Sequence, residues 1–321
     1  MKAALAIDFG GTKTIVGIVR EDGQLLAQRR FATDTSQGAL PYFQACLNEL
    51  GECMRESHVP PEQIAGIGVT VPGLADPVRG MLLHAPFLGL KEVPVAATIR
   101  SLWPDYPVFV DNDVNACALA EMKFGGALAF GSFVWVTVST GIGGAVVIDG
   151  KVWEGEHHLA GELGHIVVEW DDDANVCGCG NCGCLEVHGS GKAIERNVRR
   201  YLAGSGRDSE LAAYFARTNA PVTAESAAAA AMAGIEAAAY IFRQAGRHIG
   251  KMLSYTVNML NPAAVFIGGG VSRSFSLLQP GIMDTFSVAV IGEANKSVPI
   301  LPTGLGYEAG LLGAASLAFT K

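Results

Sequence analysis

Short apolar runs alternate with amphipathic stretches along the chain, which is the pattern of a mixed α/β fold. Residues 3–9 and 14–20 predict two strands joined by a turn at Gly10-Gly11. The Asp22-Gly23 pair predicts a hairpin turn into a third strand over residues 24–30. This segment is therefore expected to form a meander of strands around a glycine turn.

A helix and a buried strand follow this meander. Residues 39–57 have helical periodicity, and residues 64–71 form an apolar run that ends at Pro72-Gly73. Further predicted elements are a helix at 93–102, a short strand at 107–110 and a helix at 113–125. Strands alternating with helices in this way are typical of a sheet covered by helices.

The same order of elements returns in the second half of the chain. The predicted elements are a strand at 133–138, a glycine loop at 139–144, a return strand at 145–148, a turn at Asp149-Gly150 and a strand at 263–267 that ends in three glycines. We interpret this as an internal structural repeat. Two lobes built in this way would bring both glycine loops to one cleft, although two merely tight hairpins remain the alternative.

Composition adds size and surroundings to this picture. The chain has 321 residues, 50% of them hydrophobic, which is enough for two cores, and the Ala-rich stretch 223–258 predicts packed core helices. The net charge of -8 disfavours nucleic acid as a partner. No apolar run is long enough to span a membrane, and the first residues read as a strand instead of a signal peptide. We therefore expect a cytoplasmic protein with no membrane partner.

The two glycine loops are candidates for holding phosphate groups. Gly10 and Gly11 let backbone amides approach phosphate oxygens, Thr12 adds a hydroxyl and Lys13 a charge. Asp8, at the end of the first strand, is suited to hold Mg²⁺, and a turn-capping role is its alternative. In the second half Thr140, Gly141 and Gly143 offer an opposite phosphate clamp, and the glycines 268–270 a flat surface for adenosine.

A polar group also follows the strand at 107–110. Asp111, Asn112 and Asp113 precede a helix, where a carboxylate is easily kept ionised. One such carboxylate could take the proton from a sugar hydroxyl that attacks a γ-phosphate. The three residues could equally form a helix N-cap.

The strongest local signal is a group of soft ligands between residues 165 and 184. His165, Cys177, Cys179 and Cys184 fit a closed, tetrahedral, structural Zn²⁺ site, while Cys182 is a spare thiol and disulfides are the alternative. Two carboxylates flank the segment, at positions 162 and 186. If the metal holds these two glutamates in place, they are suited to accept hydrogen bonds from sugar hydroxyls. The alternative is that they are surface charges.

Taken together, these residues resemble the ROK family of bacterial sugar kinases and sugar-responsive repressors. The matching pieces are DFGGTK at 8–13, PG at 72–73, DNDVNACALAE at 111–121, STGIGG at 139–144, AGELGH at 160–165, CGCGNCGCLE at 177–186 and GGGVS at 268–272. The resemblance implies a two-lobed α/β fold of the actin-like ATPase type (ribonuclease H-like, as in hexokinase and Hsp70) with a central cleft. Residues 1–113 would form the smaller lobe, with a C-terminal helix at about 306–321 packed on it, and residues 114–305 the larger lobe with the zinc-binding segment 160–186.

The resemblance also implies roles for single residues. Asp113 takes the position of the catalytic base. The sugar-contacting positions are Gly73, Asn112, Asp113, Glu162, His165 and Glu186. Phosphate and Mg²⁺ positions fall on Asp8, Gly11, Thr12, Lys13, Thr140 and Gly141, and adenosine positions on Gly269 and Gly270. His165 would be both a zinc ligand and a sugar donor.

The implied reaction is transfer of phosphate from ATP to the 6-hydroxyl of a hexose, most readily glucose or N-acetylglucosamine. Fructose, mannose, allose and N-acetylmannosamine are alternative substrates, because residues 83–87 (LHAPF) depart from the Asn-Ala-Pro-Asn run usual in the family. A non-catalytic, sugar-sensing regulator is a more distant alternative, since only seven residues precede Asp8 where repressors carry a helix-turn-helix. Family members are commonly dimers or tetramers, so a homodimer or homotetramer is expected.

Overall fold

The computed structural model describes residues 1–171 and 174–320, and these form two compact units. The first unit consists of Met1–Gly131, Val146–Ala160 and Gly304–Lys321, and the second of Ser132–Ala145 and Gly161–Thr303. Residues 172 and 173 of the expected zinc segment, and residue 321 of the expected C-terminal helix, lie outside the described residues.

The first unit extends past residue 113, where the sequence analysis ended the smaller lobe. Helix α3 (Asp113–Phe124) belongs to this unit because it packs closely on α11 (Ala309–Thr320). A Cβ on Gly313 of α11 would lie 2.7 Å from the carbonyl carbon of Ala116, so the two backbones nearly touch. This close packing places α3 in the first unit, together with α11.

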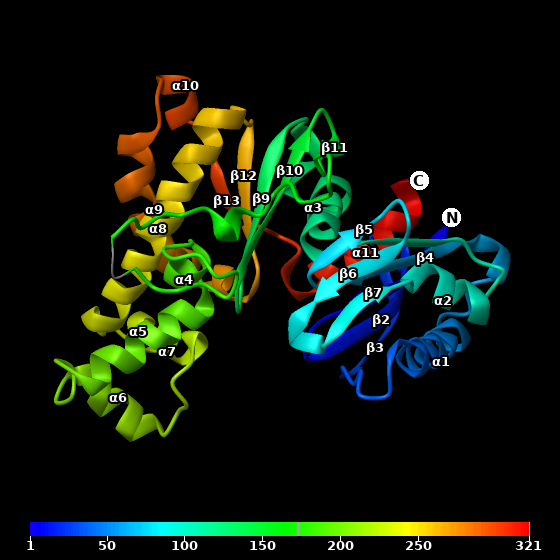
Figure 1. The fold of residues 1–321 in the computed structure, drawn as a ribbon, viewed down its shortest axis with the longest axis horizontal. Coiled ribbons are helices and arrows are strands. Elements are labelled where there is room, and N and C mark those ends of the chain that lie inside the picture. The colour runs from blue at the N-terminus through cyan, green and yellow to red at the C-terminus, as the bar shows by residue number, and fades with distance from the viewer. Residues whose placement is uncertain (172–173, 321) are drawn as a thin grey trace. The chain divides into compact units, whose positions relative to one another are not determined.

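A five-stranded sheet in the order β3-β2-β1-β4-β8 forms the centre of the first unit (Figure 1). Its strands are β1 (Ala3–Phe9), β2 (Lys13–Arg20), β3 (Leu25–Ala32), β4 (Ile64–Val71) and β8 (Val108–Asn112). β1 pairs antiparallel with β2 and parallel with β4, and β4 pairs parallel with β8. The strand and turn pattern predicted for residues 3–30 is therefore confirmed.

Helices cover both faces of this sheet. Leu5 and Ile7 of β1 share one apolar cluster with α1 (Ala39–Ser57) and α2 (Val95–Leu102). Ala4 and Ala6, on the opposite face of the same strand, share another with α11. The small side chains on that face let α11 approach the sheet closely.

A second, three-stranded sheet in the first unit was not predicted. It has the order β5-β6-β7 and consists of β5 (Leu74–Asp76), β6 (Met81–Ala85) and β7 (Leu90–Val93). The 3-10 helices of this unit are η1 (Pro61–Gln63), η2 (Pro86–Leu88), η3 (Gly126–Ala129) and η6 (Gly306–Glu308). The strands β5, β6 and β7 are three to five residues long, which is too short for an alternating hydrophobic pattern to be recognised in the sequence.

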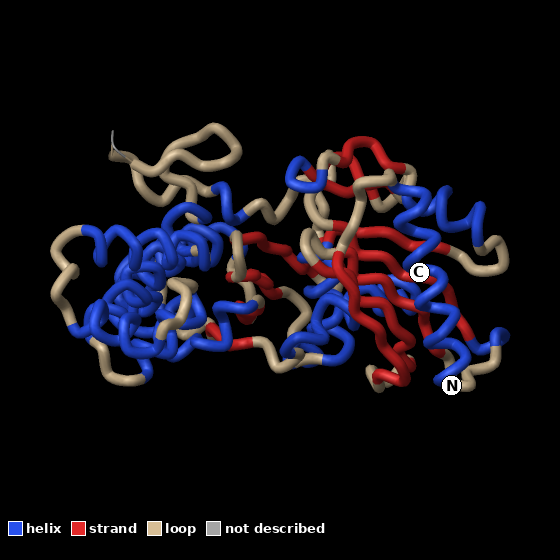
Figure 2. The backbone as a smooth tube through the Cα atoms, turned by 90° about the horizontal axis from the view of Figure 1, so that it is seen from below, coloured by secondary structure: helices blue, strands red, loops and turns tan. Residues whose placement is uncertain are grey.

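The second unit repeats the central sheet and carries more helices (Figure 2). Its strands are β9 (Phe133–Val138), β10 (Ile142–Ile148), β12 (Ala264–Gly268) and β13 (Ile300–Pro302). Its helices are α4 (Glu186–Gly189), α5 (Gly191–Ala203), α6 (Glu210–Thr218), α7 (Ala224–Met232), α8 (Glu236–Leu260), α9 (Phe275–Ala289) and α10 (Glu293–Lys296), with the 3-10 helices η4 (Leu163–His165) and η5 (Gly270–Ser274). From residue 146 onward β10 continues in the first unit, where it pairs with β11 (Lys151–Val152).

The predicted internal repeat is confirmed by the sheet orders. The order β11-β10-β9-β12-β13 reproduces β3-β2-β1-β4-β8 strand for strand. Asp149 and Gly150 have φ angles of 49° and 72°, as the predicted hairpin turn requires. The Ala-rich stretch forms α7 and α8, which contribute to the apolar cluster of the second unit.

One boundary of the repeat was predicted wrongly. A glycine loop was predicted at 139–144, but β10 begins at Ile142, so the loop is only Ser139–Gly141 and Gly143 lies in the strand. Gly144 makes room for another segment that crosses the strand, because a Cβ there would overlap Leu163 Cδ1 and lie 2.9 Å from the Gly161 carbonyl oxygen. Among the described residues, no helix is long and apolar enough to cross a membrane.

Candidate active site and metal centre

Three strands of the first unit end together at one edge of its sheet. The parallel register aligns Asp8 of β1 with Thr70 of β4, and Thr70 with Asp111 of β8. Asn112 and Asp113 follow directly on β8. Loops at the carboxyl ends of parallel strands are the usual place for ligand-binding groups, and the candidate residues of this unit lie there.

Asp8 is fixed on two sides. Thr70 Oγ1 donates a hydrogen bond of 2.9 Å to Asp8 Oδ1. Gly310, in the first turn of α11, lies so close that a Cβ there would overlap the Asp8 carboxylate. Burial raises the pKa of Asp8, while the Thr70 hydrogen bond and the charges of Lys13 and Arg30 lower it. A half-buried carboxylate whose pKa is raised by burial gains from a nearby cation, so its surroundings fit the predicted Mg²⁺ role.

The first glycine turn is closed by backbone and hydroxyl contacts. Gly10 N–H donates to the Lys13 carbonyl at 3.1 Å, and Thr33 Oγ1 donates to the Gly10 carbonyl at 2.7 Å. Thr33 is in turn hydrogen-bonded to Thr14 at 2.8 Å. Thr12 and Lys13 stay exposed at the tip of the turn. Hydrogen bonds at its base thus fix the turn while the residues at its tip stay accessible, as a phosphate-binding turn requires.

Asn112 is the N-cap of α3, so the capping interpretation of this polar group is confirmed for that residue. Its Oδ1 accepts from the Val114 and Asn115 amides at 2.8 and 3.3 Å, and its Nδ2 donates to the Gly73 carbonyl at 2.7 Å. Gly73 and Asn112, both predicted sugar contacts, therefore lie next to each other. Gly73 has a φ of 90°, a backbone conformation that favours glycine.

Asp113 is the first residue of α3, at the positive end of the helix dipole. Its charge and that of Asp8 both act on Cys117, one helical turn further along. Burial is the largest cause that raises the pKa of this thiol, and the two carboxylates add to it. Asp113 and Asp8 therefore lie near the same point of the first unit.

The second unit brings its own glycine segments together. The Gly191 amide donates to the Ser139 carbonyl at 2.8 Å, which places the start of α5 against the loop Ser139–Gly141. Gly269 has a φ of 89°, and a Cβ on it would lie 2.5 Å from the Val138 carbonyl oxygen. The end of β9, from which the loop with Thr140 and Gly141 starts, thus lies beside Gly269 and Gly270 at the carboxyl end of β12. Gly143 lies apart from this loop, in β10.

Helix α5 adds a feature that the sequence analysis did not use. Its N-cap Ser190 accepts a hydrogen bond from the Ala193 amide at 3.2 Å, and the first residues of the helix lie against the loop Ser139–Gly141. The N-terminus of a helix favours negative charge, including that of phosphate groups. This arrangement supports the predicted phosphate-binding role of the loop.

The segment 161–165 lies across β10. A Cβ on Gly164 would overlap the Ile142 carbonyl oxygen, so this glycine allows the close crossing. The crossing brings Glu162 and His165 together, with His165 Nε2 3.9 Å from Glu162 Oε2. Burial raises the pKa of Glu162, the charge of His165 lowers it, and the charge of Glu186 raises it again. The three predicted sugar contacts of this unit are therefore neighbours.

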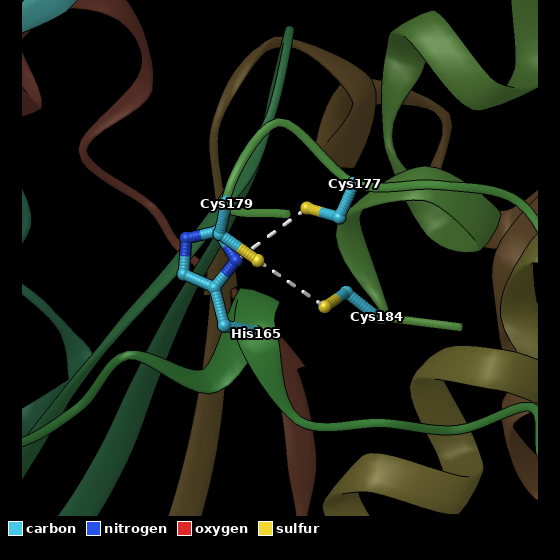
Figure 3. A group of neighbouring side chains, drawn as sticks. All are labelled: His165, Cys177, Cys179 and Cys184. Carbon is cyan, nitrogen blue, oxygen red and sulfur yellow. Dashed lines mark hydrogen bonds between the residues drawn. The ribbon is translucent and has the colours of Figure 1, made fainter. Parts of the chain in front are cut away.

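His165 turns its other ring nitrogen toward the cysteines. Its Nδ1 lies 3.6 Å from Cys177 Sγ, and the Sγ atoms of Cys179 and Cys184 are 3.7 Å apart (Figure 3). All four ligand atoms lie within 4.8 Å of one another. Four sulfur ligands around Zn²⁺ at its usual bond length are about 3.8 Å apart. The donor set and its spacing fit a tetrahedral zinc ion.

Cys182 lies outside this group. It is exposed, and all seven cysteines are free, so the disulfide alternative is wrong. Burial raises the pKa of Cys184 to about 12, and the neighbouring thiols add to the effect. Thiols crowded in this way are costly to ionise without a cation, which is a further reason why the group suits a metal.

Two residues that position the candidate site were missed by the sequence analysis. Thr70 is a buried hydroxyl at the end of an apolar strand, and Gly310 is a glycine in the first turn of an apolar helix. A polar residue inside an apolar run, such as Thr70, can be noticed in the sequence. The need for glycine at position 310 cannot be predicted from the sequence, because it depends on contact with the carboxylate of Asp8, which is distant along the chain.

Comparison with known proteins decides the family. The sequence matches the ROK family over residues 4–321. The chain belongs to the ROK family. Its fold is the two-lobed, actin-like ATPase fold of ROK glucokinase structures, as expected.

Similar proteins of this family include both kinases and a regulator. A glucokinase of Streptomyces coelicolor is 30% identical over 320 residues, which cover 99% of this chain and 98% of that protein. A ROK family glucokinase from Streptomyces griseus, crystallised with glucose and AMPPNP, has a TM-score of 0.84 and 29% identity, and the match covers 99% of this chain and 100% of that one. A ROK family transcriptional regulator, a homologue of the E. coli MLC protein, has a TM-score of 0.88 and 27% identity, but the match covers only 78% of that chain.

Proposed function

We propose that this protein is an ATP-dependent hexose kinase that phosphorylates the 6-hydroxyl of glucose or N-acetylglucosamine. The observation that carries the proposal is the pair Asp8 and Asp113 in the first unit. One carboxylate is half-buried beside the glycine turn, and the other begins a helix at the carboxyl end of β8. The full-length similarity to glucokinases supports the same reading.

Asp113 is proposed as the general base. It would take the proton from the sugar hydroxyl as that oxygen attacks the γ-phosphate of ATP. Asn112 and Gly73, joined by a hydrogen bond of 2.7 Å, would bind the sugar beside it. Glu162, His165 and Glu186 of the second unit would accept or donate hydrogen bonds to further hydroxyls.

The glycine segments are proposed to bind the nucleotide. Gly10, Gly11, Thr12 and Lys13 would contact its phosphates, with Thr140 and Gly141 on the second unit. Gly269 and Gly270 would lie against adenosine. Asp8 would hold Mg²⁺, which neutralises phosphate charge when bound. Gly143 is the weakest member of the predicted set because it lies in a strand.

The cysteine group is proposed to bind a structural Zn²⁺ through His165 Nδ1 and three thiolates. Four protein ligands leave no open position on the metal, so its contribution is to fix the segment that carries Glu162 and Glu186. His165 Nε2 would remain available to a sugar hydroxyl. The cytoplasmic location, the homodimer or homotetramer and the absence of nucleic acid partners stay predictions.

A coupled assay of ADP release over a panel of sugars tests the proposal. We expect turnover with glucose or N-acetylglucosamine, and the panel includes fructose, mannose, allose and N-acetylmannosamine as the alternatives. If no sugar stimulates ADP release, the kinase proposal is wrong. Sugar binding without turnover would favour a regulator, the class of one of the similar structures.

Asp113→Asn separates the base from the sugar contacts. The amide keeps the shape of the side chain but cannot accept the proton, so kcat should fall on the order of 10²–10⁴-fold while the sugar still binds. Steady-state kinetics and a sugar-binding titration measure the two effects. An undiminished kcat would assign the base to another residue.

A further inference from the structure

One side chain of the second unit contacts the glycine loop and belongs to the predicted sugar-binding group. Glu186 follows the cysteine segment as the first residue of α4. Its Oε2 accepts a hydrogen bond of 3.1 Å from the Ile142 amide, at the point where the loop Ser139–Gly141 enters β10. The same oxygen lies where a Cβ on Gly141 would be, so the carboxylate rests directly on the loop.

The residues after Glu186 hold the other side of the same loop. The amides of Gly191 and Lys192 donate to the Ser139 and Thr140 carbonyls at 2.8 and 3.4 Å. The continuous segment from Glu186 to Lys192 therefore hydrogen-bonds to two carbonyls of the loop and, through the Glu186 carboxylate, to the amide that follows the loop. A shift of this segment would therefore also move the loop.

On its other side Glu186 is held near the sugar-contacting candidates by backbone contacts. The Leu185 amide donates to the Ile166 carbonyl at 2.9 Å, and a Cβ on Gly164 would overlap the carbonyl oxygen of Ile142, the residue whose amide Glu186 binds. Glu162 lies 3.9 Å from His165, and His165 lies 3.6 Å from Cys177 in the proposed metal group. Glu162, by contrast, makes no hydrogen bond to the glycine loop among the described residues.

We propose that Glu186 couples sugar binding to nucleotide binding, an inference that rests on the kinase function proposed above. One carboxylate oxygen is held by the Ile142 amide, and the second is the one that a sugar hydroxyl would engage. A bound sugar orders the carboxylate, and the ordered carboxylate orders the loop that binds phosphate. Each ligand then strengthens the binding of the other by the same factor. Glu186 acts here as a positioning residue for the loop in addition to contacting the sugar.

The test measures the affinity for ADP with and without saturating glucose, by calorimetry, in the wild-type protein and two variants. In the wild type, glucose should strengthen ADP binding about 5-fold or more. In Glu186→Ala this factor should fall to near 1, although ADP alone still binds. Glu162→Gln is the matched control: it should weaken glucose binding but, once glucose is saturating, keep the wild-type factor.

A second variant covers the case in which Glu186→Ala fails to fold or to bind glucose. Gly141→Ala places a methyl group where Glu186 Oε2 lies, which moves the carboxylate off the loop without removing it. This variant should also lose the factor while it still binds glucose and ADP separately. A factor that is absent in the wild type, or undiminished in the variants, would overturn the coupling. Failure of the wild type to bind either ligand would instead overturn the proposed function.

Discussion

At the scale of single residues, candidates for the chemistry can be named from the sequence where a residue type carries it. Asp8, Asp113 and the four soft ligands stand out because carboxylates that follow strands and clustered cysteines are typical of catalytic and metal sites, as well as of turn and helix caps for the carboxylates. The residues that only position them do not stand out. Thr70 and Gly310 act on Asp8 through contacts that depend on how distant segments pack.

Gly310→Ala tests this positioning of Asp8. The added methyl group overlaps the carboxylate, so Asp8 must move, and misplacement by about 1 Å can cost on the order of 100-fold in rate. We expect a lower kcat and a higher Mg²⁺ concentration for half-maximal activity, both measured by ADP release. Gly304→Ala is the control, because a Cβ there meets nothing within 4 Å. Equal Mg²⁺ dependence of the two variants would contradict the positioning of Asp8 by Gly310.

A half-buried histidine of the second unit predicts how stability depends on pH. The pKa of His248 is lowered to about 4, mostly by burial, with His188 and Lys251 adding to the effect and Glu169 opposing it. An unfolded histidine titrates near 6.5, so between about pH 6.5 and 4 the unfolded state binds more protons. The free energy of unfolding should therefore fall as the pH falls through this window, by about 1–3 kcal/mol.

Urea unfolding of the wild type and His248→Gln at pH 7 and pH 5 measures this effect. The variant cannot take up the proton, so its loss of stability between the two pH values should be smaller than that of the wild type. His157→Gln, at an exposed position, should behave like the wild type. The same pH dependence in all three proteins would show that His248 is not the cause.

At the scale of elements, two of the longer periodic segments were predicted to the residue, and the shortest strands were not predicted. The helix at 39–57 and the strand at 64–71 have the bounds that their patterns predict. The strands β5 to β7 are too short to show a pattern. The second glycine loop was predicted too long because β10 begins at Ile142 and Gly144 makes room for the segment that crosses this strand, a tertiary contact that local sequence does not reveal.

The cysteine segment gives a prediction at this scale. Cys179→Ser removes one proposed zinc ligand, which should release the metal, cost more than about 2 kcal/mol and lower the melting temperature by more than about 4 °C. Cys182→Ser, at the exposed cysteine outside the group, should leave both unchanged. Metal analysis and thermal unfolding decide the matter. A wild-type protein that is metal-free, or equally stable after treatment with a chelator, would contradict the zinc site.

At the scale of the whole molecule, the doubled strand order was readable because the same motifs recur in both halves. What could not be read is the extent of each unit. The first unit collects three separate stretches of chain, and α3 belongs to it through its packing on α11. The sequence also does not reveal the preferred hexose, because the volume of a sugar pocket depends on backbone positions and not on motifs.

The most direct test of the central claim follows the phosphoryl group itself. The protein is incubated with ATP and Mg²⁺ and either the sugar that gives the highest turnover, expected to be glucose or N-acetylglucosamine, or its 6-deoxy analogue, and the products are identified by phosphorus NMR. The account predicts a hexose 6-phosphate and an equal amount of ADP from the sugar, and no sugar phosphate from the 6-deoxy analogue. A phosphate at another hydroxyl, or ADP formed without any sugar phosphate, would contradict it.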